Sequence, residues 1–386
     1  MRITDVRTWL VGNPWKNWLF VRVDTDEGIH GVGEGTLNAL TRTVGTAIEE
    51  LRAQYIGLDP TQVELLLQRM VRDPYSEGGQ LHMTAAAAIE VACWDIIGKS
   101  VGLPVHALLG GRMRDKVRVY ANGWYRVDRT PEAFAQAARD VVARGYQALK
   151  FDPFGAAWRV QSRREEDLSI DIVAAVRDAV GPATEVMIEG HSRFSVATAL
   201  RIADRLAPHR PTWFEEPVQH QHIGAMVEVA RRSPVPISTG ESFSSTHQFA
   251  ELLAHDAVHI IQPEPLYLGG LWRTRQVAAM ADAHYAVVAP HNAQGPVCGA
   301  ISVQLGACIP NFFVMETFEE FNADWTRQIV DHPIEVVDGE VQVPDRPGLG
   351  IDLDWERLDA HPYEPQHWLP LFGEGWERRE SRATDG

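Results

Sequence analysis

Between residues 148 and 317 the chain repeats a pattern of short apolar runs, each of which ends at or next to an ionisable residue. The runs are ALKFD at 148–152, EVMIEGH at 185–191, WFEEP at 213–217, ISTGE at 237–241, HIIQPE at 259–264, VVAPH at 287–291 and FFVMET at 312–317. From Glu189 to Glu316 the ionisable residues recur at intervals of 23 to 27 residues. That spacing accommodates one strand, a loop, one helix and a second loop, so the pattern predicts a repeated β/α unit.

Each run is too short for a helix and is apolar on both faces, which is typical of a buried parallel strand. The segments between the runs have helical periodicity; Leu200, Ala203 and Leu206 follow a candidate cap at Ser195. This alternation fits a (β/α) barrel or a doubly wound sheet. The ionisable residues fall at the carboxyl ends of the strands, which a closed barrel gathers around one mouth, so we predict a barrel with its active site there. The segment VRVYANGW at 117–124 is then the first barrel strand.

The flanking segments predict a second, smaller domain. Residues 1–36 have strand patterns, helices are expected at 40–54, 60–72 and 84–99, and a Gly- and Pro-punctuated link follows at 102–117. After Glu316 the sequence indicates a hairpin around Asp338-Gly339, and strands this late suggest that the chain returns to complete the N-terminal sheet. We therefore expect an α+β capping domain from residues 1–115, completed by 331–386, and a barrel from 116–330. The charged last residues, from Gly373 on, are expected to fray.

Composition narrows the class of partner. The formal net charge of −16 argues against nucleic acid or an anionic membrane as a partner. We find no apolar run long enough to span a bilayer and no signal peptide, and the three cysteines lie in apolar, helix-like stretches without ligand spacing. We expect a cytoplasmic enzyme with buried thiols.

Three glutamates, Glu189, Glu215 and Glu241, end consecutive strands and should converge if the barrel forms. Like charges about 4 Å apart repel by roughly 4 kcal/mol at an effective dielectric near 20, so three bare carboxylates would not stay ionised together. A divalent cation resolves that conflict, and oxygen ligands favour Mg²⁺, with Mn²⁺ next. The alternative is that some of these glutamates form structural ion pairs with Lys or Arg. Whether Glu215 or Glu216 reaches the mouth stays open, because adjacent strand residues point to opposite faces.

Several residues near the same mouth are candidates for acid–base chemistry. Glu264 ends the strand before His291 and could fix its imidazole tautomer and raise its basicity, which makes His291 a candidate general base. His191, two residues beyond Glu189, is a second acid–base candidate. Lys150 could bind a substrate carboxylate or form a salt bridge with one of the glutamates. Glu316 could hydrogen-bond a developing oxyanion in its protonated form.

Substrate contacts are expected from the strand ends and from a loop of the capping domain. The loop at 13–18 carries Trp15 and Lys16, which contact ligand or instead plug a domain interface. We add Asp152 and Trp124, which stand at the carboxyl ends of the second and first predicted strand segments, as substrate-binding candidates. Loops 13–18 and 73–82 would close over the distal end of the substrate.

In this order, these motifs resemble the enolase superfamily, specifically its mandelate racemase branch. The matching motifs are ALKFD, the EGH after strand three, FEEP, the TGE of ISTGES, QPE followed by Gly-Gly, APHN and the MET of strand eight. The resemblance implies a modified (β/α)₇β TIM barrel with an α+β cap, and one Mg²⁺ per subunit held by Glu189, Glu215 and Glu241. It implies a His291–Glu264 dyad and a role for Glu316 in holding the substrate carboxylate. His191 matches the second histidine of sugar-acid (galactonate-type) dehydratases.

Three departures from the family pattern bear on the reaction. Glu189 and Glu264 stand where the family commonly has Asp. Lys150-Phe151-Asp152 replaces the Lys-x-Lys of racemases, which removes one of two opposed bases and favours elimination.

The leading expectation is a Mg²⁺-dependent lyase that abstracts the proton beside a sugar-acid carboxylate and eliminates the 3-hydroxyl, giving a 2-keto-3-deoxy acid. A cycloisomerase that opens an anhydro- or lactone sugar acid is the alternative, and a racemase or epimerase is third. A metal-dependent hydrolase would need a His-x-His that YANGW lacks, and a non-catalytic relative would be expected to have lost His291 or a metal ligand. We expect a small-molecule sugar acid as the substrate and a homo-oligomer.

Overall fold

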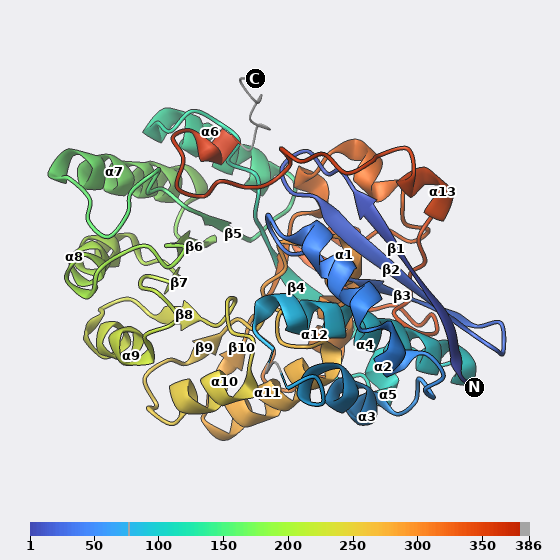
Figure 1. Ribbon diagram of the computed structural model, residues 1–386. Coiled ribbons are helices and arrows are strands. Elements are labelled where there is room, and N and C mark those ends of the chain that lie inside the picture. The colour runs from blue at the N-terminus through green and yellow to red at the C-terminus, as the bar shows by residue number, and fades with distance from the viewer. Residues whose placement is uncertain (76–77, 379–386) are drawn as a thin grey trace.

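The computed structural model describes residues 1–75 and 78–378, and its centre is a closed barrel of parallel strands (Figure 1). The eight strands are β4 (Lys116–Ala121), β5 (Ala148–Phe151), β6 (Glu185–Glu189), β7 (Trp213–Glu215), β8 (Ile237–Thr239), β9 (Ile260–Ile261), β10 (Val287–Val288) and β11 (Met315–Thr317). Strands β4 to β10 pair in sequence order and β11 pairs with β4. A parallel bridge between Val288 and Phe312 joins β10 to the chain entering β11, so the ring closes.

Seven helices connect consecutive strands and surround the barrel, all within residues that the structure describes. They are α6 (Pro131–Ala143), α7 (Arg163–Val180), α8 (Val196–Leu206), α9 (Ile223–Arg232), α10 (Thr246–Leu253), α11 (Leu271–Ala283) and α12 (Pro296–Cys308). Ser195 caps α8 by accepting a hydrogen bond from the Thr198 N–H, as expected from the sequence. The barrel predicted from the apolar runs and its (β/α)₇β form implied by the family resemblance are both confirmed, and each predicted run contains a strand.

The two-residue period of the strands creates the mouth. One layer of inward side chains fills the barrel floor: Tyr120, Ala148, Met187, Trp213, Ile260, Ala289 and Val314. Each of these floor residues is followed, two positions later in the chain, by a polar or charged residue at or just beyond the strand end. In the same order, these residues are Asn122, Lys150, Glu189, Glu215, Gln262, His291 and Glu316. Side chains two residues apart share a face, so an apolar floor in this register places a ring of polar and charged groups directly above it.

The capping domain lies beside the barrel, on the right in Figure 1. Its antiparallel sheet consists of β1 (Ile3–Val11), β2 (Trp18–Thr25) and β3 (His30–Glu34). Its helices are α1 (Thr41–Glu50), α2 (Arg52–Tyr55), α3 (Val63–Leu67), the π-helical turn η1 (Gln68–Arg72), α4 (Gln80–Val101) and α5 (Val105–Leu108). The helical segments predicted at 40–54, 60–72 and 84–99 are therefore present, the first two each divided in two. Helix α4 has the length and composition of a membrane span, which differs from the sequence expectation, but 78% of that stretch is buried inside the fold.

The late hairpin forms, but not where we expected. Strands β12 (Val336–Val337) and β13 (Glu340–Gln342) flank Asp338 and Gly339, which both have positive φ, as a tight hairpin turn requires. Strand β13 pairs antiparallel with β4 of the barrel. The prediction that these strands complete the N-terminal sheet is therefore wrong. Residues 119–121 of β4 pair with β11, whereas residues 116–118 on the same strand have free hydrogen-bonding groups, and β13 pairs there.

The remaining tail runs along the capping domain and returns to the barrel mouth. Its short helical turns, together with those in the barrel loops, are η2 (Ala207–His209), η3 (Glu319–Phe321), η4 (Asp324–Arg327), α13 (Trp355–Leu358) and η5 (Trp376–Arg378). Asp352 pairs with His30 and Lys99 of the cap. Trp376 is buried and its indole N–H donates to the Gly155 carbonyl, so the predicted fraying does not hold there. The expected fraying of 379–386 falls outside the described residues.

Two buried glutamates of the cap bind the amino ends of two barrel helices. Glu90 of α4 accepts hydrogen bonds from the Leu271 and Trp272 N–H groups at the start of α11. Glu34 of β3 accepts from the Gly295 and Cys298 N–H groups at the start of α12. Helix amino ends expose unpaired donors and a positive partial charge, so both carboxylates are well placed there. Helices α11 and α12 directly follow Glu264 and His291, so the cap stabilises the part of the barrel that carries the predicted dyad.

Candidate active site

The three predicted metal ligands meet at the mouth of the barrel. Glu189 ends β6, Glu215 ends β7 and Glu241 lies just beyond β8, and one carboxylate oxygen of each lies within 4.8 Å of the others. Burial, followed by the charge of Glu189, raises the pKa of Glu215 to about 8 and that of Glu241 well above its usual value. Carboxylates in this state need a positive charge to remain ionised.

Lys150 supplies part of that charge. Its buried ammonium lies 3.2 Å from Glu189 Oε2 and 3.0 Å from Glu316 Oε1, and it also pairs with Glu215 Oε1. Burial lowers the pKa of Lys150, but Glu215 and Glu316 outweigh it and the net shift is upward, so the ammonium stays charged. The salt-bridge alternative for Lys150 is thus observed, with three glutamates instead of one.

The charges and the donor atoms together fit a small divalent cation. The Lys150 ammonium pairs with the carboxylates of Glu189, Glu215 and Glu316, and Glu241 adds a fourth carboxylate to the cluster, so the acidic groups outnumber this cation. The three candidate ligands offer only oxygen donors, and Mg²⁺ prefers oxygen donors and typically binds through a few carboxylates plus substrate and water. The residues present therefore suit the cation that the sequence predicts.

The structure resolves the choice between Glu215 and Glu216. Glu216 points away from the barrel axis and is fully engaged there: it accepts hydrogen bonds from Ser192 Oγ, from Thr239 Oγ1 and from the Gly240 N–H. Glu215 faces the interior with Lys150, as alternation along a strand requires. Glu216 fastens the loop after β6 to the loop after β8, and the candidate ligand is Glu215.

His291 and Glu264 form the predicted dyad. His291 Nδ1 lies 2.7 Å from Glu264 Oε2, while Nε2 faces the mouth, 3.4 Å from Glu241 Oε2 and 3.8 Å from Glu316 Oε2. Burial lowers the pKa of His291, but the charge of Glu316 and the hydrogen bond to Glu264 raise it further, so the net shift is upward. The dyad therefore holds a basic imidazole whose Nε2 is directed at the carboxylate cluster.

His191 belongs to a second cluster on the other side of Glu189. Its Nδ1 lies 2.6 Å from Asp152 Oδ2, an oxygen that also accepts from the guanidinium of Arg193. Burial lowers the pKa of His191, and the hydrogen bond to Asp152 only partly offsets that effect. The indole of Trp376 packs edge-on against the imidazole, with ring centroids 5.4 Å apart. Asp152 is fully buried and bound to protein groups, so it positions His191 in this structure.

Glu316 is held in its ionised form. Oε1 accepts from the Asn122 amide and from Lys150, and Oε2 accepts from the Asn292 N–H at 2.9 Å. Burial raises the pKa of Glu316, but Lys150 and His291 lower it more strongly, to about 2. These contacts favour the ionised form of Glu316. The expected hydrogen bond to an oxyanion needs the protonated form, and that role stays a prediction.

The three remaining candidates occupy different places. Trp15 is buried between the cap and the barrel, where its indole N–H donates to Asn322 and its ring stacks on Phe318. Lys16 is also buried and donates to Gln294 Oε1. Trp124 lies outside the ring of strands, packed against Phe134 and Phe151, with its indole N–H on the Lys150 carbonyl. Trp124 is not brought to the carboxylates.

Four positions at the site were not singled out from the sequence. Gln294 donates to Glu264, Arg193 pairs with Asp152, Asn122 binds Glu316, and Trp376 packs on His191. Asn122 had a usable signal, because it stands two residues beyond the inward Tyr120. For Trp376 the only sequence signal was that a large aromatic residue stands in an otherwise polar and charged tail.

A small cavity lies beside His191 and Glu241. It has a volume of about 200 Å³ and is lined by Glu241 and His191 together with polar residues of the loop at 219–221 and with Leu371 and Phe372 of the tail. On the cap side, Gln80 of the predicted closing loop 73–82 donates to the Ser242 carbonyl next to Glu241. Residues 76–77 of that loop lie outside the described part of the chain.

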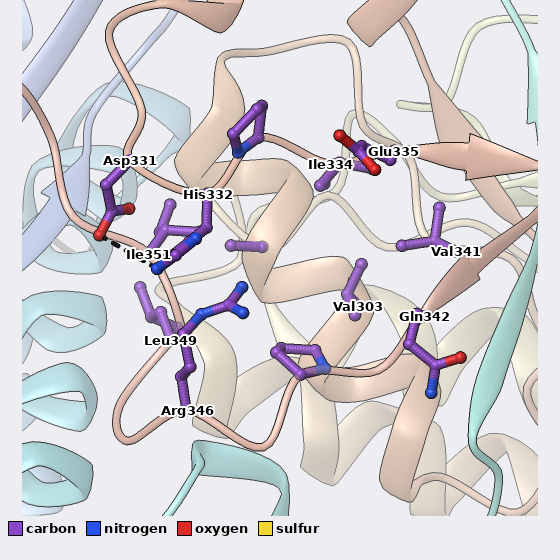
Figure 2. Close-up of a pocket in the computed structure, with 13 residues that line it drawn as sticks. Val303, Asp331, His332, Ile334, Glu335, Val341, Gln342, Arg346, Leu349 and Ile351 are labelled. Carbon is purple, nitrogen blue, oxygen red and sulfur yellow. Dashed lines mark ion pairs between the residues drawn. The ribbon is translucent and has the colours of Figure 1, made fainter.

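A separate hollow of about 400 Å³ lies between α12, the β12–β13 hairpin and the tail. Figure 2 shows its lining, which includes Asp331, His332, Ile334, Arg346 and Leu349. Asp331 and His332 face each other at 3.8 Å. None of the predicted site residues lines it, so the barrel mouth is the candidate active site.

Comparison with known proteins agrees with this geometry. Residues 133–357 match the family model described as "Enolase C-terminal domain-like", and residues 14–110 match the N-terminal domain of mandelate racemase / muconate lactonizing enzyme. The chain is 36% identical to a D-gluconate dehydratase of Thermoproteus tenax, over 91% of this chain and 71% of the relative. It is 32% identical to a D-galactonate dehydratase of Variovorax paradoxus, over 95% of this chain and 96% of the relative.

Solved structures give the same assignment. A mandelate racemase/muconate lactonizing enzyme from Sulfitobacter sp. superposes with a TM-score of 0.89 at 34% identity, covering 94% of this chain and 96% of that one. The matched models, the barrel with its cap and the ordered site residues all agree. The chain therefore belongs to the enolase superfamily, in its mandelate racemase branch, and groups there with the sugar-acid dehydratases.

Proposed function

We propose that this protein is a Mg²⁺-dependent sugar-acid dehydratase that converts an aldonic acid into a 2-keto-3-deoxy acid. The observation that carries the proposal is the position of His291, whose Nε2 lies 3.4 Å from the nearest oxygen of a three-carboxylate cluster. A base beside a cation site suits removal of a proton next to a carboxylate. The dehydratase names of the relatives supply the reaction class.

Glu189, Glu215 and Glu241 would hold the cation. When bound, Mg²⁺ would supply the positive charge that stabilises the negative charge developing on the substrate carboxylate as the C2 proton leaves. Lys150 adds a fixed positive charge beside the same carboxylates, which favours the ionised forms of Glu215 and Glu316.

His291 accepts the C2 proton at Nε2. Glu264 keeps the opposite nitrogen, Nδ1, protonated, so that the lone pair of Nε2 faces the mouth. The imidazolium formed by this step lies between Glu264 and Glu316, whose negative charges stabilise it. A general base of this kind typically contributes about 10²- to 10⁴-fold to the rate.

His191 protonates the departing 3-hydroxyl from Nε2. The C3–O bond breaks, the electron pair left at C2 forms the C2–C3 double bond, and the resulting enol tautomerises to the keto acid, with one water released. Burial lowers the pKa of His191, so its imidazolium, once formed, is a strong proton donor. Asp152, which fixes Nδ1 of His191, plays the part that Glu264 plays for His291.

A panel of aldonic, aldaric and anhydro sugar acids tests the proposal. Purified protein with Mg²⁺ is expected to convert at least one aldonic acid into a product that has lost one water and reacts as a 2-keto acid. A product of unchanged mass would instead indicate a cycloisomerase. Solvent deuterium in recovered substrate, without a keto acid, would indicate a racemase or epimerase, and either result would refute the dehydratase assignment.

A further inference from the structure

A buried contact links the cap to the predicted dyad. Lys16, in the cap loop formed by residues 13–18, is 5% exposed and its ammonium lies 2.9 Å from Gln294 Oε1 on the barrel. The same ammonium lies 4.8 Å from the centroid of the Trp15 ring. Gln294 is 3% exposed, so the contact is shielded from solvent on both sides.

Lys16 determines which way the Gln294 amide faces. An ammonium has only donors, so the amide oxygen must point to Lys16 and the amide nitrogen must point away from it. On that opposite side the nitrogen lies 2.9 Å from the Tyr267 hydroxyl and 3.4 Å from Glu264 Oε2. The oxygen of Glu264 that Gln294 approaches is the one bound to His291 Nδ1.

Gln294 completes the donor set around the Glu264 carboxylate. Oε1 accepts from the Leu266 N–H at 3.0 Å and from the Cys298 thiol at 3.2 Å, and Oε2 accepts from His291 and Gln294. A buried carboxylate with four donors in fixed positions has one favoured orientation. That orientation sets the tautomer and direction of the imidazole.

We propose that Gln294 is a positioning residue for the Glu264–His291 pair and that Lys16 locks it, so that the pair is fully ordered only when the cap loop is seated on the barrel. This inference rests on the proposed function for the role of His291 as the base. It assigns Lys16 to the dyad rather than to the substrate. Lys16 lies on the cap and Gln294 on the barrel, so the contact couples loop closure to readiness for proton abstraction.

Steady-state kinetics of Gln294→Leu, Lys16→Met and the double variant test the lock. Each single change removes one side of the contact, and the loss of a hydrogen-bonding partner behind a functional side chain typically lowers activity by on the order of 10- to 100-fold. We expect a fall of this size in kcat with little change in KM. Because the two residues act in series, the double variant should be no slower than the slower single variant. Lys16→Arg, which keeps a donor, should retain most of the turnover.

The opposite pattern would overturn the inference. If Lys16 binds substrate directly, Lys16→Met should raise KM, and its effect should multiply with that of Gln294→Leu. Gln147→Leu is a matched control, because the side chain of this exposed glutamine lies at the amino end of the barrel, where it donates to the Asp338 carbonyl. It should leave kcat and KM unchanged.

Hydrogen exchange separates failure of this inference from failure of the proposed function, because it needs no turnover. The Leu266 amide donates to Glu264 and so reports the orientation of that carboxylate. Lys16→Met and Gln294→Leu should each speed exchange of this amide and of the cap loop, while Gln147→Leu should not. If exchange is unaltered in both variants the lock is refuted, even where the dehydratase assay succeeds; faster exchange supports the lock even where no sugar acid is turned over.

Discussion

Replacing Glu90 by alanine should destabilise the protein strongly although Glu90 is outside the active site. The Glu90 carboxylate is fully buried and accepts three hydrogen bonds, from the Leu271 N–H at 2.9 Å, the Trp272 N–H at 2.8 Å and the Trp94 indole at 2.9 Å. It therefore caps α11 from another domain. The backbone is adapted to it as well: Gly270 has φ +108°, and a Cβ there would lie 2.0 Å from the Glu90 carboxylate.

The size of the effect follows from these contacts. Loss of a helix cap costs about 0.5–2 kcal/mol, and each buried donor left without a partner costs about 1–3 kcal/mol. The Trp94 indole is only half-buried and can recover part of its loss from water. We therefore expect the free energy of unfolding to fall by roughly 3 kcal/mol in Glu90→Ala. Glu90→Gln keeps the shape and one acceptor oxygen, so its loss should be about half as large.

Urea unfolding followed by tryptophan fluorescence measures this change. Glu64→Ala is the matched control, because Glu64 contacts the same helix through Trp272, Arg273 and Gln276 but is 55% exposed. Its loss should stay within about 0.5 kcal/mol of wild type. If Glu90→Ala were no more damaging than Glu64→Ala, the view that the cap stabilises α11 through this carboxylate would be wrong.

Three further changes test other parts of the structure. His291→Asn should lower keto-acid formation at least 10²-fold with an unchanged circular dichroism spectrum; near-normal turnover would refute its assignment as the base. Glu241→Gln should lose most bound Mg²⁺ by metal analysis while remaining folded, and full metal content would exclude Glu241 as a ligand. Burial raises the pKa of Asp352, but the hydrogen bond to His30 and the charge of Lys99 outweigh burial and lower this pKa to about 2. The ionised Asp352 carboxylate therefore stabilises the fold above the unfolded pKa near 3.8, and this stabilisation is lost as the pH falls towards 2. The difference in unfolding free energy between wild type and Asp352→Asn should be about 1 kcal/mol at pH 6, after allowance for solvent exposure, and should vanish near pH 2; a difference that grows in acid would contradict this.

The barrel and most of the mouth were predictable because both depend on local periodicity. A strand alternates its faces, so an apolar floor residue such as Met187 or Trp213 fixes the direction of the residue two positions later. That rule places Glu189 and Glu215 inside without knowledge of any contact. It stops where the strand stops: β4 ends at Ala121, and Trp124 turns outward into the aromatic layer.

The features that the sequence did not predict depend on partners distant in the chain. A turn at Asp338-Gly339 predicts a hairpin, but nothing local states that β13 will pair with β4. The buried state of Glu34 and Glu90 depends on helices about 180 to 260 residues further along, so each looks like an ordinary charged residue in the sequence. In the same way, Trp376 belongs to a polar tail and acquires its role only where that tail meets His191.

The longer side chain at position 264 helps explain why this dyad has so many supports. Glu has one more rotatable bond than the Asp that is common at this place in the family, so its carboxylate loses more conformational freedom when it is fixed against an imidazole. Here the extra freedom is removed by donors from three directions: the Leu266 backbone, the Cys298 thiol and the Gln294 amide. Two of these donors depend on the cap, because Glu34 binds the backbone of Cys298 and Lys16 binds Gln294. On the inference proposed above, the capping domain therefore also helps to orient the proposed general base in the barrel.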